Sequence, residues 1–118
     1  MDSNCLGFVD CDVNEFFNVK KVGLCKKWTT APVYFMITKR GQSIEIHIGA
    51  KGRDGKRQIR AAGMAIIEYI RQKYTWCKMI IATVALKSVY NLCVKLGFKD
   101  LGRCNRFTPP ANVMVIKL

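Results

Sequence analysis

Cationic side chains gather in and beside one glycine-rich segment, residues 49–57, and they are the strongest chemical signal in the sequence. The helical pattern that follows begins at Gln58. A glycine-rich segment that opens a helix suits phosphate, because the first N–H groups of a helix lack partners within it and the helix dipole favours negative charge. A solvated surface turn has the same composition, so both interpretations stand. The cations are Lys51, Arg53, Lys56, Arg57 and Arg60, set against the single Asp54.

Two titratable side chains, Glu45 and His47, precede this segment. In residues 43–48 the isoleucines alternate with polar residues, which predicts a β-strand with Glu45 and His47 together on its polar face. Carboxylate and imidazole groups are common proton acceptors in proteins. The alternative interpretation is that both are ordinary solvated or hydrogen-bonded strand residues without a chemical role.

The apolar periodicity predicts the elements that position these residues. Residues 32–38 and 43–48 flank a polar turn and form a predicted β-hairpin, and the helix from Gln58 carries apolar residues at helical spacing. In chain order we expect a short helix from Asp12 to Cys25, the hairpin, the helix from Gln58, a strand over 77–84 buried on both faces, a helix over 87–96 capped by Gly97, an irregular strand over 98–107, a turn at 108–110 and a strand over 113–118.

This order, α-β-β-α-β-α-β-β, predicts an α/β (α+β) fold with a mixed central β-sheet and helices packed on its faces. The chain has 118 residues, of which 50% are hydrophobic, and a formal net charge of +12. So much apolar surface excludes a disordered basic tail. At this length we expect a single domain over residues 1–118, with no second lobe to close over a substrate.

The N-terminus and the cysteines indicate an intracellular, cytoplasmic protein. No basic segment followed by an apolar stretch opens the chain, and the longest apolar run, residues 79–86, is far shorter than the roughly twenty residues of a spanning helix. The six cysteines form no C-x-x-C pair, so we expect reduced thiols, mostly small buried hydrophobes, and no metal site.

Two motifs together resemble the GNAT superfamily of acyl-CoA-dependent N-acetyltransferases. The family's pyrophosphate motif is Arg or Gln, two residues, Gly, one residue, then Gly or Ala, and Gln58, Ala61 and Gly63 fall on these positions, with Ala61 replacing the first glycine. The family's second signature is a helix that ends in Lys-Leu-Gly-Phe, which residues 95–98 match. The resemblance extends from Ser43 to Leu118, and the element order there also fits.

The resemblance implies acetyl-CoA as co-substrate, no metal, and transfer of the acetyl group to a primary amine. Glu45 and His47 would then act as bases, directly or through water. Backbone N–H groups near Ile48 and Gly49, where this strand should diverge from residues 80–83, would meet the charge on the carbonyl oxygen and bind the pantetheine arm. The residues expected to bind the cofactor's phosphates are Arg57, Gln58, Ile59, Arg60, Ala61, Ala62 and Gly63.

The chain departs from the family at two positions. Leu86 stands where an asparagine is usual, and Cys93 stands where a tyrosine often protonates the departing CoA thiolate. Cys93 could donate that proton, and Tyr90 lies one turn earlier on about the same helix face. The other interpretation of Cys93 is a packed core thiol.

Three functions remain open from the sequence. The first is acetyl transfer to an amine of a protein or small molecule, and the second is a GNAT-fold binding or structural protein without catalysis. The third is a basic nucleic-acid-binding module, although no helix-turn-helix or RNA-binding pattern accompanies the charge.

Short divergent chains of this style resemble bacteriophage proteins, which would place this protein in a host cytoplasm. A homodimer is compatible with the sequence. An acidic acceptor or partner is favoured by the cations expected to border the acceptor site: Lys20, Lys21, Lys26, Lys27, Lys39 and Arg40.

Overall fold

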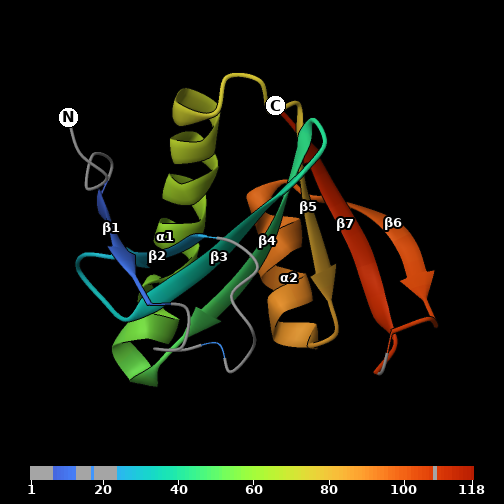
Figure 1. The fold of residues 1–118 in the computed structure, drawn as a ribbon. Coiled ribbons are helices and arrows are strands. Elements are labelled where there is room, and N and C mark those ends of the chain that lie inside the picture. The colour runs from blue at the N-terminus through green and yellow to red at the C-terminus, as the bar shows by residue number, and fades with distance from the viewer. Residues whose placement is uncertain (1–6, 13–16, 18–23, 108) are drawn as a thin grey trace.

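The fold is a single seven-stranded sheet with two helices, as seen in a computed structural model that describes residues 7–12, 17, 24–107 and 109–118. The strand order across the sheet is β1-β2-β3-β4-β5-β7-β6 (Figure 1). Within the described ranges the strands are β1 (Phe8–Cys11), β2 (Leu24–Trp28), β3 (Val33–Arg40), β4 (Ser43–Ala50), β5 (Met79–Val84), β6 (Lys99–Cys104) and β7 (Ala111–Lys117).

The sheet is mixed, as predicted. Its β4 and β5 pair in parallel, and the other neighbouring strands pair antiparallel. A parallel pair needs a long crossover, and α1 (Gly52–Lys73) supplies it. The second helix, α2 (Lys87–Leu96), connects β5 to β6 and ends at Gly97, whose φ of 99° is the left-handed cap that the sequence predicted.

Both helices lie on the same face of the sheet and contact each other (Figure 1). The main core fills the space between them and the strands, because alternate residues of the central strands point to this side. Its fully buried side chains include Phe35, Ile44, Ile66, Ile80 and Met114. A smaller cluster on the opposite face of the sheet contains Cys25, Tyr34 and Met36.

The N-terminal part of the prediction was wrong where the structure describes it. Leu24 and Cys25 belong to β2 rather than to the end of a helix, and β2 pairs with both β1 and β3. Most of the predicted helix, residues 13–16 and 18–23, lies outside the described residues. Local apolar spacing misassigned this segment because strand pairing between distant segments stabilises it, and a local pattern does not report such pairing.

Two further predictions need correction. Residues 52–57 form the first turns of α1 rather than a loop, so the helix starts six residues before Gln58. The strand β5 has one face in the core, while Met79, Ile81 and Thr83 on the other face are only half-buried. The hairpin, the irregular strand and the last strand are confirmed as β3–β4, β6 and β7. Neither described helix is long and apolar enough to cross a membrane.

Candidate functional site

The parallel strands β4 and β5 separate before they end, which opens a wedge in the sheet. Their pairing runs from Ser43 and Met79 to Ile46 and Ala82, whereas β4 continues to Ala50 and β5 to Val84. The divergence predicted near Ile48 and Gly49 is therefore confirmed. Backbone groups of β4 that face the gap are free of β5 and available to a bound molecule.

A cavity of about 500 Å³ lies at this wedge, on the side of the sheet that carries the helices. This volume is within the usual range for small-molecule sites, roughly 300–1,000 Å³. We call it the wedge cavity. Its lining is mainly apolar, with one cation, and comes from the end of β4, from α1, and from the start of α2: Ile48, Gly49, Ala50, Lys56, Ile59, Leu86, Ser88, Val89 and Leu92.

The N-terminus of α1 adjoins the wedge cavity and has no side-chain cap. Lys51 is the N-cap and makes no side-chain capping hydrogen bond, so the N–H groups of Gly52, Arg53 and Asp54 have no partner within the helix. The peptide N–H of Gly55 donates to the Lys51 carbonyl oxygen at 3.2 Å. This uncapped helix start lies at Gly52, six residues before Gln58.

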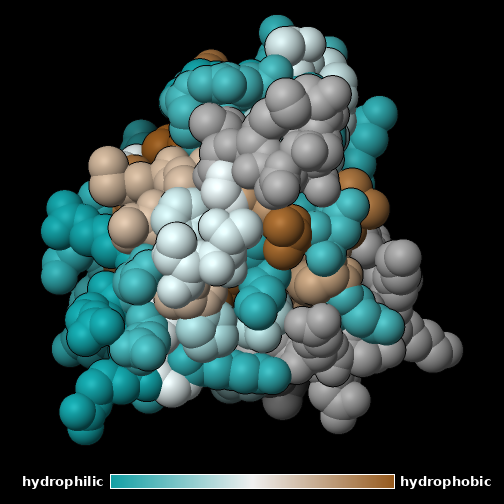
Figure 2. All heavy atoms as spheres, turned by 90° about the vertical axis from the view of Figure 1, so that its left-hand side faces the viewer, coloured by the Kyte–Doolittle hydropathy of each residue, from teal (hydrophilic) through white to brown (hydrophobic). Residues whose placement is uncertain are grey.

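Cations surround this helix start. Lys56 lines the wedge cavity, and Lys51, Arg53 and Arg60 are exposed. Arg57 is partly neutralised, since its Nη2 lies 2.8 Å from the Asp54 Oδ1. In Figure 2 the lower part of the face, over the N-terminal end of α1, is mainly hydrophilic. The electrostatic field at the helix start is therefore positive.

The residues of the predicted pyrophosphate motif lie inside α1 and have structural surroundings. The Gln58 Oε1 accepts hydrogen bonds from Trp28 Nε1 at 3.2 Å and from Thr30 Oγ1 at 2.7 Å. Ala62 and Gly63 are buried, and a Cβ at Gly63 would lie 2.7 Å from a Leu96 methyl group. Helical residues this far from the first turn bond their N–H groups within the helix. Of the predicted phosphate-binding set, Ile59 alone lines the wedge cavity, and Ala61 is exposed.

Glu45 and His47 lie together on the face of β4 opposite the helices, as predicted. The Glu45 Oε2 is 3.5 Å from the His47 Nε2, and its Oε1 accepts a hydrogen bond from the Arg40 Nε at 3.0 Å. The Glu45 side chain is 21% exposed. Pairing of β4 with β5 stops at Ile46, between these two residues. Neither side chain lines the wedge cavity, which lies on the other face of the sheet.

Cys93 and Tyr90 have different surroundings on α2. Cys93 is completely buried in the core, and burial raises the pKa of its thiol to about 11. This supports its interpretation as a packed core thiol. The Tyr90 hydroxyl donates to Asp100 Oδ2 at 2.8 Å, and this bond raises the pKa of Tyr90. Tyr90 does not line the wedge cavity, so neither residue is placed at the wedge as a proton donor.

Lys26 was expected at the border of an acceptor site, but it is buried. Its ammonium group bonds to the Asp10 carboxylate and lies 5.5 Å from the centre of the Tyr69 ring. Burial alone would lower the pKa of Lys26, but Asp10 and Tyr69 outweigh it and raise the pKa above its usual value. Lys26 therefore stabilises the β1–β2 end of the sheet and contributes no surface charge.

The sequence analysis did not identify the α2 side of the wedge cavity. Ser88, Val89 and Leu92 line it, and the last two are spaced three residues apart on one face of the helix. That spacing was visible in the sequence, but it is the same as the spacing of core residues. Within the described ranges, no three His, Cys, Asp or Glu side chains are placed to hold a metal ion.

No family model matches the sequence, and no curated protein matches it significantly. Solved structures do match. An acetyltransferase from Bacillus subtilis in complex with CoA superimposes with a TM-score of 0.68 at 17% identity, over 90% of this chain and 82% of that one. A GNAT-family acetyltransferase from Bacillus anthracis gives 0.66 at 17% identity, over 89% and 70%.

A chimera of the spermidine N-acetyltransferase SpeG from Vibrio cholerae with hSSAT gives a TM-score of 0.63 at 17% identity, over 89% of this chain and 74% of that one. At these identities the likeness establishes the fold. The chain has the GNAT fold, and the resemblance drawn from its motifs is confirmed at that level.

Proposed function

We propose that this protein is an N-acetyltransferase that moves an acetyl group from acetyl-CoA to a primary amine. One observation carries the proposal, namely that the apolar wedge cavity opens where β4 and β5 separate and adjoins an uncapped, cation-rich helix N-terminus. A cavity beside such a helix start suits a ligand that joins a thin arm with amide groups to a pyrophosphate. The solved structure with the TM-score of 0.68 was determined with CoA, which adds support by likeness of fold.

In this proposal the phosphates lie on the first N–H groups of α1, at Gly52 to Asp54, with Lys56 nearby. Residues 58–63 act indirectly, because Gln58 and Gly63 fix α1 against the β2–β3 turn and against α2. The pantetheine arm occupies the wedge cavity and bonds to the free edge of β4. The thioester then lies near Ile48 and Gly49, whose peptide N–H groups would stabilise the oxyanion.

The reaction needs two proton transfers. The amine nitrogen attacks the thioester carbonyl carbon, the carbon–sulfur bond breaks, and the CoA thiolate leaves with the electron pair. Glu45, with His47 beside it, is the base we assign to the amine proton, directly or through water. The thiolate takes its proton from water, since Cys93 is fully buried and Tyr90 is bonded to Asp100.

A second candidate is acetyl-CoA binding without catalysis. The observation that favours it is Cys93, buried at the position where the family often has a proton-donating tyrosine. Both candidates share the cofactor site, and they differ in turnover.

One experiment separates them. The protein is incubated with acetyl-CoA and a panel of primary amines, and thermal stabilisation and acetylated product are measured together, the latter by mass spectrometry. We expect stabilisation with product. Stabilisation without product would select the non-catalytic candidate. A result with no stabilisation and no product would overturn both candidates.

Paired variants locate the site. Lys56→Glu should weaken acetyl-CoA binding by about tenfold or more, because a bond to a charged partner is lost and a repulsion is gained. Lys95→Glu makes the same change on the exposed part of α2, outside the lining of the wedge cavity, and should bind normally. Equal affinity in the two variants would contradict the placement.

A further inference from the structure

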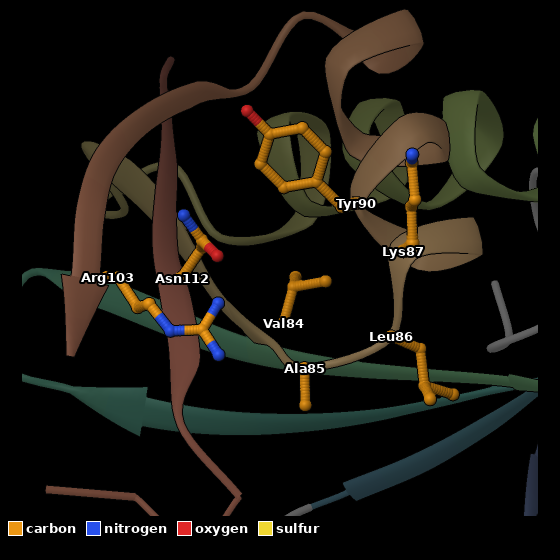
Figure 3. A pocket seen from close by; sticks show the side chains of 7 residues that line it. All are labelled: Val84, Ala85, Leu86, Lys87, Tyr90, Arg103 and Asn112. Atoms are coloured by element: carbon orange, nitrogen blue, oxygen red, sulfur yellow. The ribbon is translucent and has the colours of Figure 1, made fainter. Parts of the chain in front are cut away.

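A second cavity, of about 280 Å³, lies between the end of β5, the start of α2, and the strands β6 and β7 (Figure 3). We call it the β6–β7 cavity. Leu86 lines both cavities, so a molecule held in the β6–β7 cavity adjoins the wedge. The volume of the β6–β7 cavity falls just below the usual range of ligand sites, so this cavity suits one small group rather than a large ligand.

A β-bulge in β6 directs Arg103 toward this cavity. Asp100 pairs with Met114 and Arg103 with Asn112, so β6 advances three residues where β7 advances two. Without the extra residue, Asp100 and Arg103 would point to opposite faces of the sheet. With it, both share the face of Met114, which is the side of the helices. Gly102, with φ of 119°, permits the bulge.

Figure 3 shows the Arg103 guanidinium extending from β6 toward Ala85, below Asn112 and Tyr90. Arg103 makes no ion pair with a carboxylate in the part of the chain that the structure describes, and neither does Lys87, the other cation of the lining. The lining itself contains no acidic residue among those described. A planar guanidinium with five donors is the side chain best suited to bind a carboxylate through two bonds.

The nearby carboxylate, Asp100, is already satisfied by other donors. Its Oδ1 accepts from the Gly102 N–H at 2.8 Å, its Oδ2 accepts from Tyr90 at 2.8 Å, and the Asn112 amide lies 3.1 Å from Oδ2. The Gly102 N–H, Tyr90 and Asn112 together lower the pKa of Asp100, which keeps it ionised and bound to them. Asp100 thus fixes Tyr90 and Asn112 in place and leaves Arg103 available to a ligand.

We propose that the β6–β7 cavity binds the carboxylate of the acceptor, so that the acceptor is a small primary amine that carries a carboxylate, with Arg103 as the residue that selects it. This inference rests on the proposed acetyl transfer, and it names the substrate class. The carboxylate could belong to a free amino acid or to an acidic residue next to a peptide N-terminus, and the cavity volume favours the amino acid.

Matched acceptors test the proposal. Alanine is compared with alaninamide, and the peptide Ala-Asp-Ala with Ala-Asn-Ala, both peptides amidated at the C-terminus. Calorimetry measures Kd for each in the presence of unacetylated CoA, and steady-state assays with acetyl-CoA measure KM. We expect the wild type to prefer each carboxylate over its amide by about tenfold or more, with alanine ahead of the peptides.

Three variants test whether Arg103 causes the preference for a carboxylate over an amide. Arg103→Ala should abolish it, and Arg103→Lys should retain part of it, because lysine keeps the charge without the two-bond geometry. Arg106→Ala removes an equal charge from the exposed β6–β7 turn and should retain the full preference. No binding of any acceptor, equal binding of acid and amide, or an undiminished preference in Arg103→Ala would overturn the inference.

The two proposals fail in different ways. Absence of acetyl-CoA binding by the wild-type protein would refute the proposed acetyl transfer, whatever the acceptors do. Normal acetyl-CoA binding and turnover with no carboxylate preference would refute the role of Arg103 alone. A preference for peptides over alanine would move the carboxylate source to a protein N-terminus.

Discussion

The Glu45 carboxylate contacts two neighbouring side chains, Arg40 and His47. Both lie within reach of its carboxylate, at 3.0 Å and 3.5 Å. The side chain retains some exposure, so water can reach it. In our proposal, this carboxylate is the base that takes the amine proton.

We predict that Glu45→Gln lowers kcat by about a hundredfold or more, the usual contribution of a positioned base, while the calorimetric Kd for acetyl-CoA stays unchanged. Arg40→Gln is the control, because it removes the same ion pair and keeps the carboxylate. Exposed ion pairs contribute little, so kcat of this variant should stay within about twofold. A similar loss of kcat in both variants would refute the role of Glu45 as base.

At the scale of elements, two buried glycines of α1 show how tightly the helix packs on the sheet and on α2. A Cβ at Gly55 would lie 2.7 Å from the Pro32 carbonyl oxygen, and a Cβ at Gly63 would lie 2.7 Å from a Leu96 methyl. The first contact is with backbone at the start of β3. The second is with the end of a flexible side chain, which can move.

The two alanine variants should therefore differ in stability. Gly55→Ala should lower the free energy of unfolding by about 1–3 kcal/mol, the usual cost of overpacking. Gly63→Ala should change it by about 1 kcal/mol or less, because Leu96 can rotate and alanine favours the helix by a similar amount. Urea denaturation of both variants checks this. Equal destabilisation would show that the Leu96 side is as rigid as the Pro32 side.

Much of the fold could be predicted from the sequence between Pro32 and Leu118, where elements are local and strongly periodic. The hairpin turn, the apolar strand and the Gly97 cap each follow from a few adjacent residues. The start of α1 was placed too late, since Gly52 and Gly55 disfavour a helix locally. Directly before the helix, the Lys51 N–H donates to the Pro32 carbonyl oxygen at 2.9 Å, and such a contact between distant residues is absent from a local pattern.

The candidate site was predicted in part. Ile48 and Gly49 line the wedge cavity, and strand alternation places Glu45 and His47 together on the opposite face of β4. In our proposal the phosphates lie on the helix that carries the Gln58 motif, but at its first turn rather than at the motif itself. Arg103 could not be predicted, since its direction depends on the register shift between β6 and β7.

At the scale of the molecule, the net charge of +12 divides into groups with different roles. Lys26 is buried against Asp10, and Arg57 is paired with Asp54. The cations that remain available near the cavities lie at the start of α1 and beside the β6–β7 cavity. In our account, the cations at the start of α1 bind the phosphates of the cofactor, and Arg103 binds the carboxylate of the acceptor.

The central claim, that acetyl-CoA occupies the wedge cavity, is tested most directly by calorimetry on two tryptophan variants of α2. Val89 lines the cavity, whereas Val94 is 51% exposed on the same helix. Val89→Trp should fill the space of the pantetheine arm and weaken acetyl-CoA binding by at least about tenfold, which corresponds to about 1.4 kcal/mol. Val94→Trp should bind as the wild type does. Wild-type affinity in Val89→Trp, with both variants folded by circular dichroism, would contradict the account.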